Sequence, residues 1–138
     1  MPLIRRSRGF TLLELLVVMV IIGLLAAYVG PKYFSQIGKS EVKTVKAQIV
    51  GIEKALQQYR LDVGRFPTTE QGLQALQVKP TNVNKWDGPY LEKTLPPDPW
   101  GRPYAYASPG EHGDFDLSSP GRDGRPGGEG LDADITNW

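Results

Sequence analysis

The stretch FTLLELLVVMVIIGLLAAYV, residues 10–29, decides how this chain is built. It is apolar apart from Thr11, Glu14 and Gly23. As an α-helix, its roughly 20 residues would rise about 1.5 Å each and match a hydrocarbon core roughly 30 Å thick. The stretch therefore predicts one membrane-spanning helix near the N-terminus.

The residues that flank this stretch indicate its orientation. Three arginines lie within residues 5–8, and the positive-inside rule places such a flank in the cytoplasm, with everything after Pro31 outside. A basic flank before an apolar run is also typical of a cleaved secretory signal peptide. Ala26 and Ala27 are the small residues available, but they form no A-x-A cleavage site. We favour an anchored span and keep the signal peptide as an alternative.

Two residues are unusual for a simple span. Glu14 is its lone acid. Because an unpaired carboxylate at bilayer depth costs on the order of 3 kcal/mol, we expect Glu14 to have a partner cation or a functional role. Pro31 cannot donate the N–H that a continuing helix uses, so we expect a kink or local melting between Gly23 and Pro31.

Composition limits the remaining possibilities. A chain of 138 residues allows one domain beyond the span, and a net charge of +1 without basic clusters beyond the N-terminal flank argues against nucleic-acid binding. The chain has no cysteine, although the topology places the domain in an oxidising compartment. The 16 Gly and 12 Pro fall mostly after residue 63, which predicts a turn-rich C-terminal half. A bound metal would suit such a small fold without disulfides.

Beyond the span, residues 34–62 have an amphipathic pattern. Apolar residues recur at steps of three and four, which predicts a long helix with one buried stripe, and Gly64 is placed to end it. The stripe consists of Val42, Val45, Ile49, Ile52, Leu56 and Tyr59. A two-chain coiled coil is the alternative, but we favour a spine for the chain's own domain because the stripe is shorter than three heptads.

The C-terminal half predicts short elements. Thr68 and Gln71 fit a capping box that begins a short helix, and residues 98–101 fit a type I turn. Residues 102–107 and 115–118 are predicted to be short strands. The simplest packing is an α+β fold in which a small antiparallel sheet and a short helix cover the long helix. Five aromatic residues of this half are interpreted as core and turn anchors: Trp86, Tyr90, Trp100, Tyr104 and Tyr106.

No catalytic set is visible in the sequence. His112 is the only histidine, no cysteine exists, and no serine has a positioned base, so nucleophilic triads and histidine-ligated zinc sites are hard to build. His112 is expected to be a surface residue between strands. We therefore predict that the protein is not an enzyme.

Residues 123–134 concentrate carboxylates in a glycine-rich loop. Oxygen ligands on a flexible backbone suit a hard cation such as Ca²⁺, which takes six to eight of them. The spacing is not that of an EF-hand, and the single match to a G-G-x-G-x-D repeat cannot stack into a β-roll. The alternative is a solvated acidic loop without an ion.

The residues from Gly9 to Glu14 resemble the processing site of the type IV pilin and pseudopilin superfamily. This resemblance implies that a prepilin peptidase cleaves between Gly9 and Phe10 and that the new amine of Phe10 is N-methylated. It also implies an assembly role for Glu14, whose carboxylate would meet the Phe10 amine of a neighbouring subunit in a low-dielectric bundle.

Four further segments resemble the major pseudopilins of type II secretion systems. They are residues 66–76, 95–104, 119–124 and 133–138. Major type IV pilins share only the N-terminal part and commonly close their C-terminal region with a disulfide, which this sequence cannot form. The resemblance implies a cleaved leader at 1–9, a transmembrane and assembly helix at 10–33, an amphipathic half-helix at 34–62, and a periplasmic α/β region at 63–138.

The same resemblance implies a function, a location and partners. The chain would be a structural subunit stored in the bacterial inner membrane, with its N-terminus cytoplasmic, and would polymerise into a helical periplasmic pseudopilus that drives secretion of folded proteins. Its partners would be copies of itself, minor pseudopilins, the inner-membrane assembly platform and the prepilin peptidase. The alternatives are a type IV pilin of a surface fibre and a membrane-anchored periplasmic enzyme or binding domain.

For the C-terminal loop, the resemblance implies calcium as the bound ion. Asp123 and Asp134 match the acidic ligands of the family best, whereas Asp132 stands at a position where family members vary. The backbone carbonyls of Pro120 and Arg125 are further candidate ligands.

Overall fold

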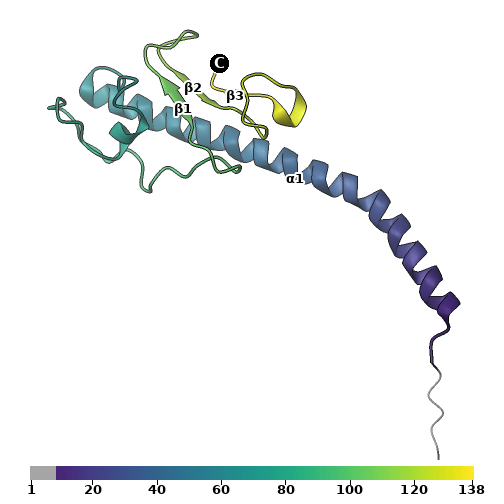
Figure 1. Ribbon diagram of the computed structural model, residues 1–138. Coiled ribbons are helices and arrows are strands. Elements are labelled where there is room, and N and C mark those ends of the chain that lie inside the picture. The colour runs from purple at the N-terminus through teal and green to yellow at the C-terminus, as the bar shows by residue number, and fades with distance from the viewer. Residues whose placement is uncertain (1–8) are drawn as a thin grey trace, which may run out of the picture. The chain divides into compact units, whose positions relative to one another are not determined.

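The computed structural model describes residues 9–138 (Figure 1). The first eight residues of the expected leader, with its three arginines, lie outside this range. The chain divides into two compact units, residues 1–37 and 38–138, and both include part of helix α1. The elements are α1 (Leu12–Val63), the 3₁₀ helices η1 (Leu73–Leu76) and η2 (Gly130–Asp132), and the strands β1 (Ala105–Ala107), β2 (Asp116–Ser119) and β3 (Ile135–Thr136).

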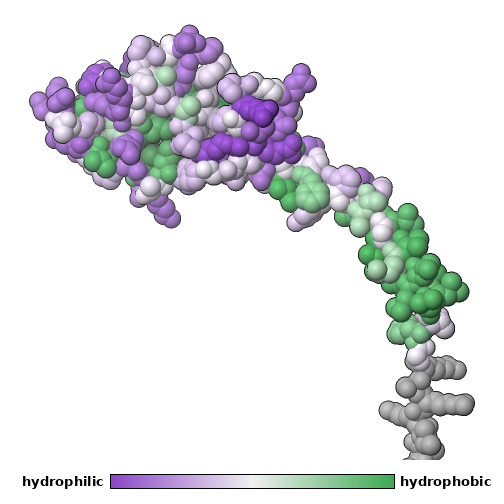
Figure 2. All heavy atoms as spheres, in the orientation of Figure 1, coloured by the Kyte–Doolittle hydropathy of each residue, from purple (hydrophilic) through white to green (hydrophobic). Residues whose placement is uncertain are grey.

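The N-terminal part of α1 is apolar and exposed. It is the one helix in the described part of the chain that is long and apolar enough to cross a membrane, and none of its most apolar window is buried (Figure 2). We expected a kink or local melting between Gly23 and Pro31. The helix continues through both residues, so local melting does not occur there. An exposed apolar surface of this extent indicates a lipid or protein environment.

The C-terminal part of α1 is the spine of the second unit. The predicted stripe is buried from Val45 to Tyr59 with Val42 at its edge, and residues of the same chain cover it (Figure 1). The coiled-coil alternative is therefore wrong for this face. The core also includes Ala55, Ala75, Leu76, Tyr104, Phe115, Leu117 and Ile135.

The end of α1 follows from its sequence. The helix stops at Val63, and Gly64 adopts φ 89° while its N–H donates to the carbonyl of Arg60 at 2.8 Å. A residue with a side chain is strained in this left-handed region, so glycine is the residue suited to this position. The predicted stop at Gly64 is confirmed.

The predicted capping box forms, but the helix after it is shorter than expected. The N–H of Gln71 donates to Thr68 Oγ1 at 3.2 Å, and the N–H of Thr68 donates to Gln71 Oε1 at 3.0 Å. Gly72 then has φ 59°, which interrupts right-handed helical geometry. As a result, residues 69–72 form turns, and a single 3₁₀ turn, η1, follows instead of an α-helix.

The sheet is antiparallel with the order β1-β2-β3. Tyr106 pairs with Leu117 between β1 and β2, and Ser119 pairs with Ile135 between β2 and β3. β1 is shorter than predicted because Pro103 has no N–H to donate to a ladder. The third strand was missed, since two paired residues carry no alternating pattern. The predicted α+β class, with a small antiparallel sheet on a long helix, is confirmed.

Aromatic side chains fasten the loops to this core. Trp86 Nε1 donates to the carbonyl of Ala75 at 2.8 Å, and the Tyr106 hydroxyl donates to the carbonyl of Pro67 at 2.8 Å. The Tyr104 hydroxyl donates to Gln48 on α1. These contacts confirm that the aromatic residues are core and turn anchors.

Candidate functional site

The first candidate site is the start of α1. The N–H of Glu14 donates to Thr11 Oγ1 at 3.2 Å. Glu14 Oε2 in turn accepts hydrogen bonds from the Thr11 N–H at 2.8 Å and from the Thr11 hydroxyl at 3.0 Å. This reciprocal pair is a capping box, which satisfies N-terminal donors that the helix itself leaves unpaired. The spacing Thr-x-x-Glu carried this signal, and our sequence reasoning did not use it.

The capping box explains how one chain accommodates the lone acid of its apolar stretch. The carboxylate of Glu14 has hydrogen-bond donors within its own chain, which lowers the cost of placing it at the edge of an apolar span. Phe10 is 83% exposed, and the Gly9–Phe10 bond precedes the first helical residue. A peptide bond outside helical hydrogen bonding is open to an enzyme, so the cleavage prediction stays consistent with the local structure.

The second candidate site is the loop between β2 and β3. Within it, Arg122 makes a two-pronged ion pair with Asp132: Nε lies 2.9 Å from Oδ1 and Nη2 lies 3.3 Å from Oδ2. The hydrogen bond and charge of Asp132 raise the pKa of Arg122 above its usual value. Both oxygens of Asp132 are therefore engaged within the loop, and a cation at Asp132 would share its carboxylate with the guanidinium of Arg122.

Asp123 and Asp134 use one carboxylate oxygen each to fold the loop. Asp123 Oδ1 accepts from the N–H of Arg125 at 3.1 Å, and Asp134 Oδ2 accepts from the N–H of Gly127 at 2.9 Å. Among residues 9–138, no three acidic or histidine side chains are gathered closely enough to hold a metal by themselves. The structure therefore does not bring Asp123, Asp132 and Asp134 together as a three-carboxylate cluster.

Glycines let the loop backbone close tightly. Gly121 has φ 66°, and a Cβ placed on it would lie 2.6 Å from the carbonyl oxygen of Ala133 and 2.8 Å from that of Asp132. A Cβ on Gly128, at φ 85°, would clash with the same Asp132 carbonyl. Two segments of the loop thus approach each other at backbone distance, which only glycine permits.

A buried carboxylate holds the turn that supports this loop. Asp98 is 3% exposed, and its Oδ1 accepts from the N–H groups of Trp100 at 3.1 Å and Arg102 at 2.8 Å. Its Oδ2 accepts from the hydroxyl of Ser119, the last residue of β2, at 2.7 Å. The predicted turn at residues 98–101 is confirmed. The sequence did not predict that the side chain of Asp98 is buried.

Arg102 connects this turn to the start of the loop. Its Nη1 donates to the carbonyls of Gly121 at 2.9 Å and Arg122 at 3.2 Å. The guanidinium also lies against Gly124, where a Cβ would overlap it. The sequence alone gave no sign of this cation, because its partners are backbone atoms about 20 residues away.

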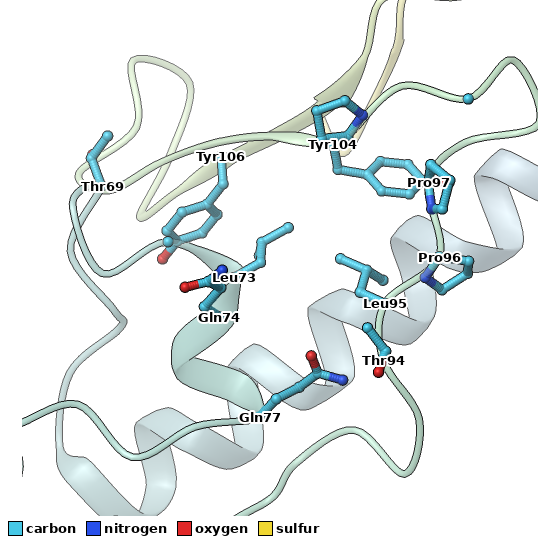
Figure 3. A pocket seen from close by; sticks show the side chains of 13 residues that line it. Thr69, Leu73, Gln74, Gln77, Thr94, Leu95, Pro96, Pro97, Tyr104 and Tyr106 are labelled. Atoms are coloured by element: carbon cyan, nitrogen blue, oxygen red, sulfur yellow. The ribbon is translucent and has the colours of Figure 1, made fainter.

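An open groove lies next to η1 (Figure 3). In this view, Leu73 and Tyr106 lie on one side of the groove, and Leu95, Pro97 and the ring of Tyr104 lie on the other. None of the 13 residues that line it is acidic, basic, histidine or serine. The groove therefore offers no general acid, general base or nucleophile apart from neutral hydroxyls and amides.

His112 lies in the connection between β1 and β2, as expected for a surface residue. Its ring stacks on Trp138 with centroids 4.1 Å apart, and its Nδ1 lies 2.9 Å from Asp116 Oδ2. Desolvation raises the pKa of Asp116, but hydrogen bonds from His112 and from the N–H of Glu111 outweigh it, so the pKa lies below its usual value. The cluster fastens the C-terminus and is not arranged for catalysis.

Comparison with known proteins identifies the family of this chain. The model of a family described as "Type II secretion system (T2SS), protein G" matches residues 32–138, and that of a prokaryotic N-terminal methylation motif matches residues 4–30. The chain belongs to the protein G family of the type II secretion system. The predicted resemblance to the major pseudopilins is thereby confirmed, as is the N-terminal methylation motif.

Relatives of this type II secretion family extend over the whole chain. The type II secretion system core protein G of Vibrio cholerae is 48% identical over 141 residues, covering 100% of this chain and 96% of the relative. That of Pseudomonas aeruginosa is 51% identical over 140 residues, covering 97% and 96%. The crystal structure of the major pseudopilin from enterohaemorrhagic Escherichia coli matches with a TM-score of 0.63 and 43% identity, covering 76% of this chain and 92% of that one.

These relatives settle the class of function. The family consists of structural pseudopilins of a secretion system, so the prediction that this chain is not an enzyme is confirmed. The pilin-like fold is confirmed by the pseudopilin structure. The N-terminal apolar helix is consistent with membrane anchoring.

Proposed function

We propose that this chain polymerises through its N-terminal helix into a periplasmic pseudopilus that drives secretion of folded proteins. The observation that carries this proposal is the fully exposed apolar half of α1, continuous with the helix that forms the spine of the folded unit. Such a surface needs lipid before assembly and the same surface of other copies after it. The family membership of the chain supports a filament subunit over a solitary anchored domain.

Before assembly, the protein would be held in the inner membrane with its N-terminus in the cytoplasm and residues 63–138 in the periplasm. The basic residues before the span support this orientation. Cleavage between Gly9 and Phe10 by a prepilin peptidase, followed by N-methylation of Phe10, would then prepare the subunit. The match of the methylation motif to residues 4–30 supports this step.

The capping box gives Glu14 two successive roles. In the single chain, Thr11 provides the donors for its carboxylate. After cleavage, Phe10 carries an α-amino cation, and in the filament this amine of a neighbouring subunit would pair with Glu14. Two groups that are costly in a low-dielectric bundle would thus offset each other and select one register. Minor pseudopilins and the inner-membrane assembly platform would complete the machinery.

Imaging of filaments from cells that overproduce the protein tests this proposal. Glu14→Ala should insert and be processed, because removing a charge eases insertion, but it should give few or no filaments. Glu70→Ala, which removes an exposed acid of the folded unit, is the matched control and should assemble normally. Mass spectrometry should find a methylated Phe10 at the N-terminus of all three proteins. Normal filaments from Glu14→Ala, or an N-terminus at Met1, would contradict the proposal.

We further propose that calcium orders the C-terminal loop. The donor chemistry fits a hard cation: Asp123 and Asp134 each have a second carboxylate oxygen to which the described residues supply no hydrogen bond, on a glycine-rich backbone. Asp132 fits less well because Arg122 engages it. The carbonyls of Pro120 and Arg125 remain candidate ligands. A bound ion would contribute charge compensation between the carboxylates of a domain that has no disulfides.

Thermal melts of the full-length protein in detergent test the calcium proposal. Binding to the folded state alone adds about 2.7 kcal/mol of stability when the free ion is 100 times its Kd. Chelation should therefore lower the melting temperature, and magnesium should restore it poorly because it demands a tight octahedral shell. Equal melting temperatures with calcium, magnesium and chelator would leave the loop as a solvated acidic turn.

A further inference from the structure

Gly38, on α1, faces one side chain of the C-terminal loop. It is buried, and a Cβ placed on it would lie 2.5 Å from Leu131 Cδ1, 3.1 Å from Cδ2 and 3.3 Å from Cγ. All three nearest atoms thus belong to Leu131. Gly51, on the same helix, has nothing within 4 Å of such an atom. The missing side chain of Gly38 therefore leaves a notch in α1 that Leu131 fills.

The helix itself gives no reason for a glycine at this position. Gly38 lies inside α1 and has no positive φ, so alanine would suit the backbone better, since glycine lowers helix stability. The close approach of Leu131 supplies the missing reason. Leu131 stands in η2, the single 3₁₀ turn of the loop, where its neighbour Asp132 is paired with Arg122.

Polar contacts surround this apolar contact. Glu41, one turn along α1 from Gly38, accepts a hydrogen bond from Trp100 Nε1 at 3.2 Å. The charge of Glu41 also helps to raise the pKa of Arg122. The turn at residues 98–101, the loop and the helix therefore meet around one point, at the first residues of the second unit.

We propose that Leu131 seated against Gly38 is a latch that holds the C-terminal loop on α1. Leu131 belongs to the loop and Gly38 belongs to α1, so each segment supplies one half of the contact. Local opening of the loop should therefore also loosen residues 38–42 of α1. The latch does not need an ion and goes beyond the proposed calcium site. A loop that opens would uncover α1 at the point where the helix leaves the folded unit.

Hydrogen exchange of the full-length protein in detergent, with calcium and separately with chelator, tests the latch. Leu131→Ala should make the amides of residues 121–134 and 38–42 exchange several-fold faster in both conditions, relative to amides of β2. Gly38→Ala should loosen the loop because its methyl group displaces Leu131. Gly51→Ala, the matched control, adds the same methyl group in open space and should leave loop exchange unchanged.

The double variant Gly38→Ala with Leu131→Ala decides whether the two residues act together. Leu131→Ala removes the three atoms nearest to the extra methyl group, Cδ1, Cδ2 and Cγ of Leu131. The double variant should therefore exchange no faster than Leu131→Ala alone. Loop exchange in Gly38→Ala equal to that in Gly51→Ala would overturn the latch, as would effects that add fully in the double variant. Neither outcome depends on whether calcium changes the exchange rates. The experiment therefore distinguishes a failure of the latch from a failure of the proposed calcium site.

Discussion

Replacing the buried Asp98 with alanine should destabilise the folded unit more than replacing an exposed acid of its loops would. Its carboxylate accepts three hydrogen bonds, at 3.1, 2.8 and 2.7 Å, while the residue is 3% exposed. Removing this acceptor leaves two N–H groups and one hydroxyl without their partner, and each buried donor left unpaired costs about 1–3 kcal/mol, so the loss is about 3 kcal/mol or more. Asp98→Ala should lose this amount of unfolding free energy.

The magnitude is large against the stability of a small domain. The total free energy of unfolding of such a domain is about 5–15 kcal/mol. A loss of 1 kcal/mol lowers the melting temperature of a 60–100-residue domain by roughly 4–8 °C. Asp98→Ala should therefore melt roughly 12 °C or more below the wild type. Asp98→Asn keeps an acceptor for the N–H groups of Trp100 and Arg102, and its amide can donate to the Ser119 oxygen, so it should lose less.

Asp114→Ala is the matched control. Asp114 pairs with Arg60 at 2.9 Å, but the two side chains are 68% and 48% exposed, and such a surface pair contributes about 0–1 kcal/mol. Circular dichroism melts of the full-length protein in detergent compare the variants, with the N-terminal span unchanged in each. Equal melting temperatures for Asp98→Ala and Asp114→Ala would refute the reasoning that burial of Asp98 decides its contribution.

Two further predictions concern the ion and high pH. Asp123→Ala and Asp134→Ala should melt like the chelated wild type and gain nothing from added calcium, and a full calcium response in both would exclude them as ligands. Burial raises the pKa of Tyr104 and Tyr106 to about 12, against an unfolded value of about 10. Because the folded pKa is the higher one, their contribution to stability is complete below pH 10 and is lost as pH rises through 12. Burial also raises the pKa of Tyr59 and Tyr90. Absorbance at high pH should therefore show late-titrating tyrosines, with Tyr104 and Tyr106 among them, and melting temperatures that stay constant from pH 10 to 12 would contradict this assignment.

Local sequence patterns were enough to predict several elements. The long apolar run determined the exposed half of α1, and the three-and-four spacing from Val42 to Tyr59 determined its buried stripe. Gly64 determined where α1 ends, and Thr68 with Gln71 determined a capping box. Each of these signals acts between residues no more than a few positions apart, so the sequence carries it directly.

Errors arose where one local signal competed with another. The capping box predicted a helix, but the positive φ of Gly72 reduced it to a 3₁₀ turn. A kink or local melting was expected between Gly23 and Pro31. Melting does not occur, because one lost hydrogen bond does not break a helix that is otherwise intact. The two residues of β3 had no periodicity to detect, and they form a strand because β2 offers them partners.

For the candidate sites, the sequence identified the residue types, and the tertiary structure decided which of them meet. The sequence indicated an acidic loop, but only the fold pairs Asp132 with Arg122 and leaves Asp123 and Asp134 with spare oxygens. Likewise, nothing near Gly38 in the sequence indicates Leu131, 93 positions away. Such contacts depend on how the turn at Asp98 directs the chain back onto α1. A contact between residues far apart in the sequence produces no periodic pattern in the residues around either partner.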